Sequence, residues 1–200
     1  MPDGFKKEEQ PSKRNNRLNI IKNRSLKKGY IQIYTGNGKG KTTAAIGQAV
    51  RAAGTGLKTY IAQFMKEDFP YSERESLKKL SEFIKLDQFA GDAFVYKGEY
   101  PPRDEVDKAE KGIKIVLESM LSGDYDIIIL DEVFVSVYFG LLTPDRVMDV
   151  LKNKPDGVEL ILTGRYCQPE FLNLADLVTI MKEEKHYYQK GISVRKGIES

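Results

Sequence analysis

A glycine-rich segment at residues 35–43 joins a strand pattern to a helix pattern, and a lysine and two threonines, residues 41–43, stand at the start of the helix pattern. Its residues are Thr35, Gly36, Asn37, Gly38, Lys39, Gly40, Lys41, Thr42 and Thr43. Glycines at alternate positions let the backbone curl so that several N–H groups point at one anion, and the N-terminus of the following helix adds about half a positive charge. We therefore predict a loop that binds the phosphates of a nucleotide.

Two side chains of this loop could do more than position it. Lys41 would bring a full positive charge to the phosphate oxygens, and the Thr42 hydroxyl could ligate Mg²⁺ or Mn²⁺, which prefer oxygen donors. The first glycine, Gly36, lies one position later than in the usual spacing of such loops, so the loop is a variant. A turn that only connected a strand to a helix would need neither the lysine nor the threonines.

An apolar run at residues 127–130 ends in two adjacent carboxylates, Asp131 and Glu132. In an open parallel sheet, ligands bind at the carboxyl ends of the strands. Adjacent strand residues point to opposite faces, so we expect one carboxylate to bind the metal and the other to hold the loop or the substrate. In a hydrolytic enzyme Glu132 would instead activate water, and the sequence leaves these roles open.

Weaker candidates lie farther along the chain. Arg165 follows an apolar run at the same predicted sheet edge and could pair with phosphate or ribose, or form a surface ion pair. Phe94 and Tyr96 lie in a connection poor in helical pattern, where they could line a flat apolar ligand site or join the core. Cys167 is expected to be a buried small side chain, and His186 a solvated or structural one.

Short apolar runs alternate with longer helical patterns, which indicates an α/β fold. We expect a single-domain, RecA-like P-loop fold with a mostly parallel central sheet and helices on both faces. The expected strands are 30–35, 58–64, 85–89, 125–130, 158–162 and 177–181. The expected helices are 40–53, 72–83, 103–121 and 144–152, with Gly54 and Gly56 supplying positive φ after the first of them.

Composition limits the class of protein. The 200 residues are 40% hydrophobic and 30% charged, with a mean hydropathy of −0.45, which suits one compact domain. The strongly apolar runs are far shorter than the roughly 20 residues that span a bilayer, and no secretory signal pattern is present, so we expect no membrane contact. One cysteine cannot form an internal disulfide, which favours the cytoplasm.

Charge divides the chain into a basic N-terminal arm, residues 1–28, and a nucleotide-binding domain, residues 29–200. The arm carries nine Lys or Arg against three Asp or Glu, a balance of +6, so the domain sums to −3. Phe5 is the one aromatic residue of the arm that could stack on a base, which disfavours nucleic acid as a partner. We expect a flexible arm that is solvated, docks a partner or closes as a lid.

Residues 29–199 resemble the P-loop type corrinoid adenosyltransferases, which make adenosylcobalamin. The resemblance rests on the variant loop and on four further stretches: Gln63-Phe64, Leu130-Asp131-Glu132, Leu162-Thr163-Gly164-Arg165 and Lys196-Gly197-Ile198-Glu199. It implies that a corrinoid in the Co(I) state attacks the ribose 5′ carbon of ATP and that triphosphate leaves. Lys39 and Lys41 would stabilise the leaving group, and Mg²⁺ would lie near Thr42 and the acidic pair, with Glu132 as its best carboxylate ligand.

The resemblance also implies further ligands and partners. Family members press aromatic side chains against the lower face of the corrinoid to expel an axial ligand, typically from a Gly-Phe-Thr-Trp stretch. This chain has no tryptophan and offers Phe94 and Tyr96 instead. Family members are typically homodimers whose N-terminal segment closes over the nucleotide. Because no residue here resembles a redox centre, an electron donor such as a reduced flavoprotein is expected, and the preferred corrinoid stays open.

Two other functions share parts of the pattern. Nucleotide kinases and RecA-like ATPases have the same loop and acidic pair, but a thymidine-kinase-like protein would usually carry paired zinc cysteines and a RecA-like motor a basic body. This chain has one cysteine and an acidic domain. A non-catalytic ATP-sensing module, whose arm orders when ATP binds, is the alternative from a different class.

Overall fold

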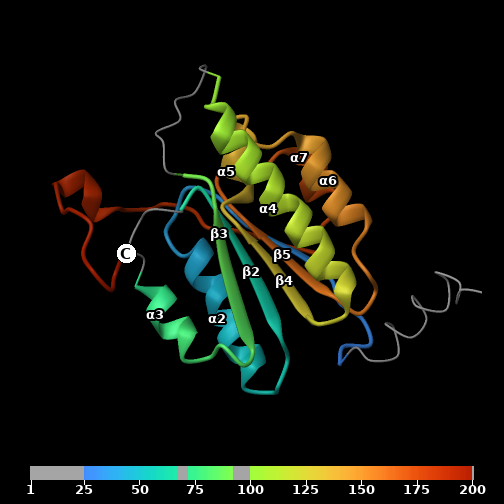
Figure 1. Cartoon of the computed structure of the whole chain (residues 1–200). Coiled ribbons are helices and arrows are strands. Elements are labelled where there is room, and N and C mark those ends of the chain that lie inside the picture. The colour runs from blue at the N-terminus through green and yellow to red at the C-terminus, as the bar shows by residue number, and fades with distance from the viewer. Residues whose placement is uncertain (1–24, 67–71, 92–99, 200) are drawn as a thin grey trace, which may run out of the picture.

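Six parallel strands form one sheet in the order β3-β2-β4-β5-β1-β6 (Figure 1). The computed structural model describes residues 25–66, 72–91 and 100–199. The strands are β1 Ile31–Thr35, β2 Thr59–Phe64, β3 Ile84–Phe89, β4 Ile127–Asp131, β5 Glu159–Thr163 and β6 Leu177–Ile180. Each lies within two residues of its predicted range, and the α/β class with a parallel sheet is confirmed.

Helices cover both faces of the sheet (Figure 1). On one face lie α2 Lys41–Ala53 and α3 Glu73–Lys78, packed against buried isoleucines of the central strands. On the other face lie α4 Arg103–Ser122, α5 Val133–Tyr138, α6 Pro144–Lys152 and α7 Pro169–Leu172. All five residues of β4 are buried, because a central strand of a doubly covered parallel sheet has no solvent face.

Local sequence explains where the long helix α4 begins and ends. It starts directly after Pro102, with Asp104 and Glu105 in the first turn, where carboxylates interact favourably with the helix dipole. It ends at Gly123, whose φ of 90° belongs to the left-handed region that glycine enters at little cost. These signals agree with the prediction of a helix over residues 103–121.

Other local predictions differ from the structure. The helix expected over residues 72–83 is confined to α3, because the chain leaves helical geometry in turns before β3. Gly54 keeps a helical φ of −62°, whereas Gly56 has the expected positive φ, at 82°. The sequence did not predict α5, α7 or the 3₁₀ helix η1 Tyr187–Lys190, since elements this short show no clear hydrophobic period.

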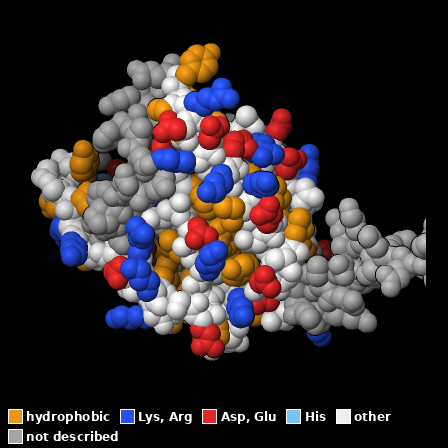
Figure 2. All heavy atoms as spheres, viewed as in Figure 1, with side chains coloured by type: hydrophobic (Ala, Val, Ile, Leu, Met, Phe, Trp, Pro, Cys, Tyr) orange, Lys and Arg blue, Asp and Glu red, His pale blue; other side chains and the backbone are white. Residues whose placement is uncertain are grey.

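The face seen in Figure 2 carries Lys and Arg side chains intermingled with Asp and Glu, over α4 and the neighbouring surface. Two ion pairs involve acidic residues of α4: Glu105 pairs with Lys108 of the same helix, and Glu110 pairs with Arg146 of α6.

Replacing Gly112 of α4 by alanine is expected to lower the free energy of unfolding by about 1–3 kcal/mol. A Cβ at this position would lie 2.6 Å from Cγ of Phe89 and 3.0 Å from Cε1 of Phe64, so the helix would have to move off the sheet. The matched control is Gly47→Ala in α2, where a Cβ would meet nothing within 4 Å. That change should stabilise by about 0.5–1 kcal/mol. Urea unfolding of both variants measures the difference, and equal stabilities would contradict the packing.

Candidate functional site

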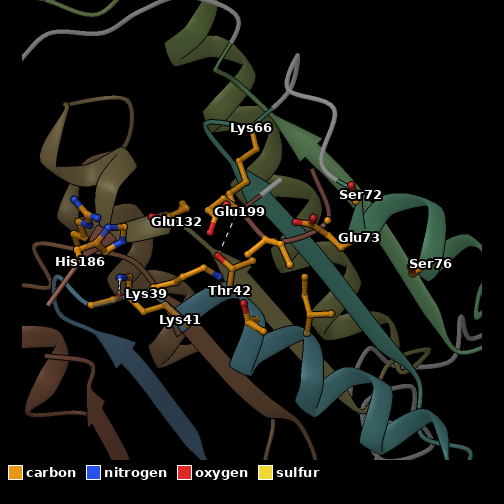
Figure 3. A pocket seen from close by; sticks show the side chains of 17 residues that line it. Lys39, Lys41, Thr42, Lys66, Ser72, Glu73, Ser76, Glu132, His186 and Glu199 are labelled. Carbon is orange, nitrogen blue, oxygen red and sulfur yellow. Dashed lines mark hydrogen bonds between the residues drawn. The ribbon is translucent and has the colours of Figure 1, made fainter. Parts of the chain in front are cut away.

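A cavity of about 640 Å³ opens at the carboxyl edge of the sheet (Figure 3). The glycine-rich loop and the start of α2 form one wall, and the start of α3 forms another. Lys66, Glu132 and Arg165 contribute from the ends of β2, β4 and β5, and the C-terminal segment closes the cavity with His186 and residues 197–199. Residues from six regions of the sequence thus meet at the strand ends, where parallel sheets bind ligands.

Glycine is needed in the loop for two different structural reasons. Gly36 and Gly40 have φ angles of 100° and 120°, which side chains with a Cβ rarely adopt. Gly38 is needed for a close approach, because a Cβ there would lie 2.8 Å from the carbonyl oxygens of Met181 and Lys182. Its N–H donates to the carbonyl of Met181, the residue that follows β6, at 2.7 Å. This N–H therefore points at the backbone of that segment and not at an anion.

Lys41, the first residue of α2, is buried beneath the loop. Its ammonium donates to the carbonyl oxygens of Gly36 and Gly38 at 2.8 and 2.9 Å, and it lines the cavity (Figure 3). Burial lowers the pKa of Lys41, and the charges of Arg165 and Lys66 act in the same direction. The ammonium therefore holds the loop in its curled form and lies where an anion in the cavity would meet it.

The two carboxylates of the acidic pair have different surroundings, as the sequence predicted. Asp131 is buried at the end of β4 and accepts four hydrogen bonds, which together fill the acceptor capacity of a carboxylate. The donors are Thr42 Oγ1 at 2.9 Å, Thr163 Oγ1 at 2.6 Å, Gln63 Nε2 at 3.1 Å and Lys66 Nζ at 2.7 Å. Burial alone would raise the pKa of Asp131, but Lys66 and the hydroxyl donors hold it below its ordinary value.

Glu132 follows the strand in a left-handed conformation, with φ of 58°, a strained geometry that is common at functional positions. Its N–H donates to Thr163 Oγ1 at 3.0 Å, which fixes the backbone, while its side chain lines the cavity. Burial, followed by the charge of Asp131, raises the pKa of Glu132. Asp131 therefore fixes the Thr42 hydroxyl, and Glu132 is the carboxylate that lines the cavity.

Comparison with known proteins assigns the family. A family model described as ATP:corrinoid adenosyltransferase BtuR/CobO/CobP matches residues 27–200. The chain belongs to this family. It is 31% identical over 172 residues to a corrinoid adenosyltransferase of Pseudomonas aeruginosa, covering 86% of this chain and 84% of that protein. It is 34% identical over 174 residues to that of Escherichia coli, covering 86% of both, and 32% identical over 186 residues to that of a Sinorhizobium species, covering 92% and 86%.

Membership makes this chain an enzyme, a transferase whose family acts on ATP and a corrinoid. The resemblance stated from the sequence is thereby confirmed, and the family favours a transferase over a kinase, an ATPase or a sensing module. In the described part of the adenosyltransferase, no helix is both long and apolar enough to cross a membrane.

Three side chains of the adenosyltransferase's site were not assigned a role from the sequence: Lys66, Gln63 and Thr163. All three lie at or just after the carboxyl ends of β2 and β5, the two strands that flank β4. Gln63 stands opposite Asp131 in the strand register. A search for polar residues at or just after the end of every predicted strand would have found them, although it could not have said which strands are neighbours.

The other residues singled out from the sequence lie in different surroundings. Arg165 is exposed and lines the cavity, close enough to Lys41 to affect its pKa. His186 also lines the cavity, but its Nδ1 accepts from the N–H of Tyr188, which fits the structural role expected of it. Cys167 is half-buried and not fully buried as predicted, and burial raises its pKa to about 12, which does not suit a nucleophile. Phe94, Tyr96 and the arm before residue 25 lie outside the described residues.

The C-terminal wall of the cavity is held by Glu199. Its carboxylate accepts from Tyr187 Oη, and from the N–H, Nε and Nη2 of Arg195, the last at 3.0 Å. The guanidinium also lies 4.9 Å above the Tyr187 ring. These hydrogen bonds lower the pKa of Glu199 to about 2, so the contact is fully present above the ordinary pKa of a glutamate and is lost only as the pH falls through about 2.

Glu199→Gln is expected to release this wall at neutral pH. Because the amide carries no charge to pair with Arg195, trypsin should cleave after Arg195 and Lys196 faster than in the unchanged protein. The KM for ATP should also rise, since a wall of the cavity becomes mobile. The matched control is Glu184→Gln, which removes an exposed ion pair with Lys182 in the same segment and should leave cleavage unchanged. Equal cleavage of all three proteins would show that Glu199 does not hold the wall.

Proposed function

We propose that the chain transfers the 5′-deoxyadenosyl group of ATP to the Co(I) centre of a reduced corrinoid. The cobalt–C5′ bond forms with the electron pair of Co(I), the C5′–O5′ bond breaks, and the pair of that bond leaves with triphosphate. The observation that carries this proposal is the joint placement of the loop, Lys41 and the Asp131-oriented Thr42 at one cavity of a family member. Glu132 and Lys41 are its proposed catalytic residues.

The main chemical demand of this reaction is to stabilise a leaving group of high negative charge. Four cationic side chains line the cavity: Lys39, Lys41, Lys66 and Arg165. Fixed charges stabilise a developing anion without having to reorganise. The loop backbone, including Gly36, Asn37, Gly40 and Thr43, would bind the phosphates, and Arg165 would reach a phosphate or the ribose.

A divalent cation, Mg²⁺ or Mn²⁺, fits the residues present. The Thr42 hydroxyl and the Glu132 carboxylate are hard oxygen donors on the same cavity, and both ions prefer such donors. Thr42 and Glu132 would hold the ion, and Asp131 would orient Thr42. When bound, the ion supplies positive charge to the triphosphate.

We also propose how the corrinoid, the N-terminal arm and an electron donor take part. Phe94 and Tyr96 would press on the lower face of the corrinoid, residues 1–28 would close over the nucleotide domain 29–200, and a reduced flavoprotein would supply the electron in the cytoplasm. A homodimer is supported by β6, an edge strand whose Val178 and Ile180 are 41% and 67% exposed. Unpaired apolar edges favour pairing with another chain. Light scattering of the purified protein tests this directly.

The proposed reaction is tested by an anaerobic assay with ATP, Mg²⁺ and chemically reduced cobalamin. We expect a light-sensitive cobalt–carbon product and triphosphate in equal amounts. Formation of ADP and phosphate with the corrinoid unchanged would assign a kinase or ATPase instead. Tight ATP binding without turnover of any corrinoid would assign a sensing module.

A further inference from the structure

Lys66 lines the cavity and is largely buried, which is unusual for a lysine. It comes two residues after β2, and only 8% of it is exposed. Its backbone is fixed on the β3 side, because the N–H of Lys66 donates to the Ala90 carbonyl at 3.1 Å. Its ammonium lies 2.7 Å from Oδ2 of Asp131. It also lies 3.1 Å from Oγ1 of Thr42, and both Lys66 and Thr42 are labelled in Figure 3.

This ammonium contacts the same group of oxygens that would receive a divalent cation. Thr42 Oγ1 is the proposed metal ligand, Asp131 is the carboxylate that orients it, and Glu132 is the next residue along the chain. A cation that approaches Thr42 therefore meets a positive charge already in place, and like charges repel strongly where little water separates them. Moving Lys66 aside without a new partner would leave two buried charges unpaired, which is costly.

A polyphosphate in the cavity would offer the Lys66 ammonium a second anionic partner. Lys66 lines the same cavity as the loop and Lys41, so its ammonium could exchange the Asp131 carboxylate for phosphate oxygens and stay paired. The oxygens of Thr42 and Glu132, together with those of the phosphate, would then be open to a divalent ion. The metal and the nucleotide would bind together and not one after the other.

We propose that Lys66 is a resident cation that closes the Thr42, Asp131 and Glu132 group to free divalent ions until a polyphosphate binds. The proposal rests on the proposed function only in taking a divalent ion and a polyphosphate as ligands of this cavity. It makes no use of the corrinoid or of adenosyl transfer.

The test measures Mn²⁺ binding to the full chain without nucleotide, from the electron paramagnetic resonance signal of free Mn²⁺. The unchanged protein should leave that signal intact, whereas Lys66→Met should bind Mn²⁺ with an affinity about tenfold higher or more, because a unit charge a few ångströms away is removed. Adding Glu132→Gln to Lys66→Met should abolish the gain. Lys39→Met is the matched control, since it removes the same charge from an exposed lysine of the same cavity that has no bond to Asp131.

Two further measurements keep the test decisive. Lys66→Gln retains a hydrogen-bond donor for Asp131 and replaces Lys66→Met if circular dichroism shows the latter unfolded. The unchanged protein should bind Mn²⁺ once inorganic triphosphate is added, beyond what triphosphate binds by itself. Mn²⁺ binding by the unchanged protein alone, or no gain in a folded Lys66 variant, would overturn the proposal. A protein that passes this test but fails the cobalamin assay would keep the role of Lys66 and lose the proposed function.

Discussion

Lys41→Ala is expected to lower kcat/KM for adenosyl transfer by roughly 100- to 1000-fold, the cost of losing one strong donor to a developing anion. Two effects combine. The cavity loses the buried cation nearest the loop, and the carbonyl oxygens of Gly36 and Gly38 lose the donor that holds the loop curled. The measurement is the steady-state rate of cobalt–carbon bond formation at several ATP concentrations.

The comparison for this variant is Lys39→Ala. Lys39 lines the same cavity but is exposed, so water screens its charge and its loss should cost much less. Circular dichroism and thermal unfolding of both variants separate a catalytic defect from a folding defect. A folded Lys41→Ala protein that kept more than about a tenth of the rate would remove Lys41 from the mechanism.

Asp131→Ala is expected to lower the free energy of unfolding by about 3–5 kcal/mol. Lys66 would remain in its buried position without its carboxylate, and Thr42, Thr163 and Gln63 would each lose an acceptor. An uncompensated buried charge is far more destabilising than the loss of the pair as a whole. Urea unfolding followed by circular dichroism measures the change.

The double variant Asp131→Ala with Lys66→Met tests the cause. If the unpaired ammonium is responsible, the double variant should be more stable than Asp131→Ala alone. Glu75→Ala is the surface control, because it breaks an ion pair with Lys78 whose side chains are 74% and 67% exposed, and it should leave stability almost unchanged. Additive effects of the two buried changes would show that Asp131 and Lys66 do not stabilise each other.

The position of the glycine-rich loop was determined by the sequence alone. The glycines, lysines and threonines between a strand and a helix predicted a phosphate site, and the structure places residues 38–43 of this segment at a cavity. The acidic pair was predicted at a strand end, and the different tasks expected of Asp131 and Glu132 agree with their different hydrogen bonds. The positions of these residues could be predicted because the residues are neighbours along the chain, where local geometry decides the outcome.

The tertiary structure alone decided which distant residues complete the site. Lys66, Gln63 and Thr163 reach Asp131 because β2 and β5 flank β4, and the register sets Gln63 opposite Asp131. Strand order is fixed by long-range pairing that the order of strands along the sequence does not reveal. The same holds for the C-terminal segment, which brings Glu199 back to the loop. The sequence by itself therefore determined where the glycine-rich loop and the acidic pair lie, and the packing of the sheet decided which charges surround them, because only folding brings those charges within a few ångströms of one another.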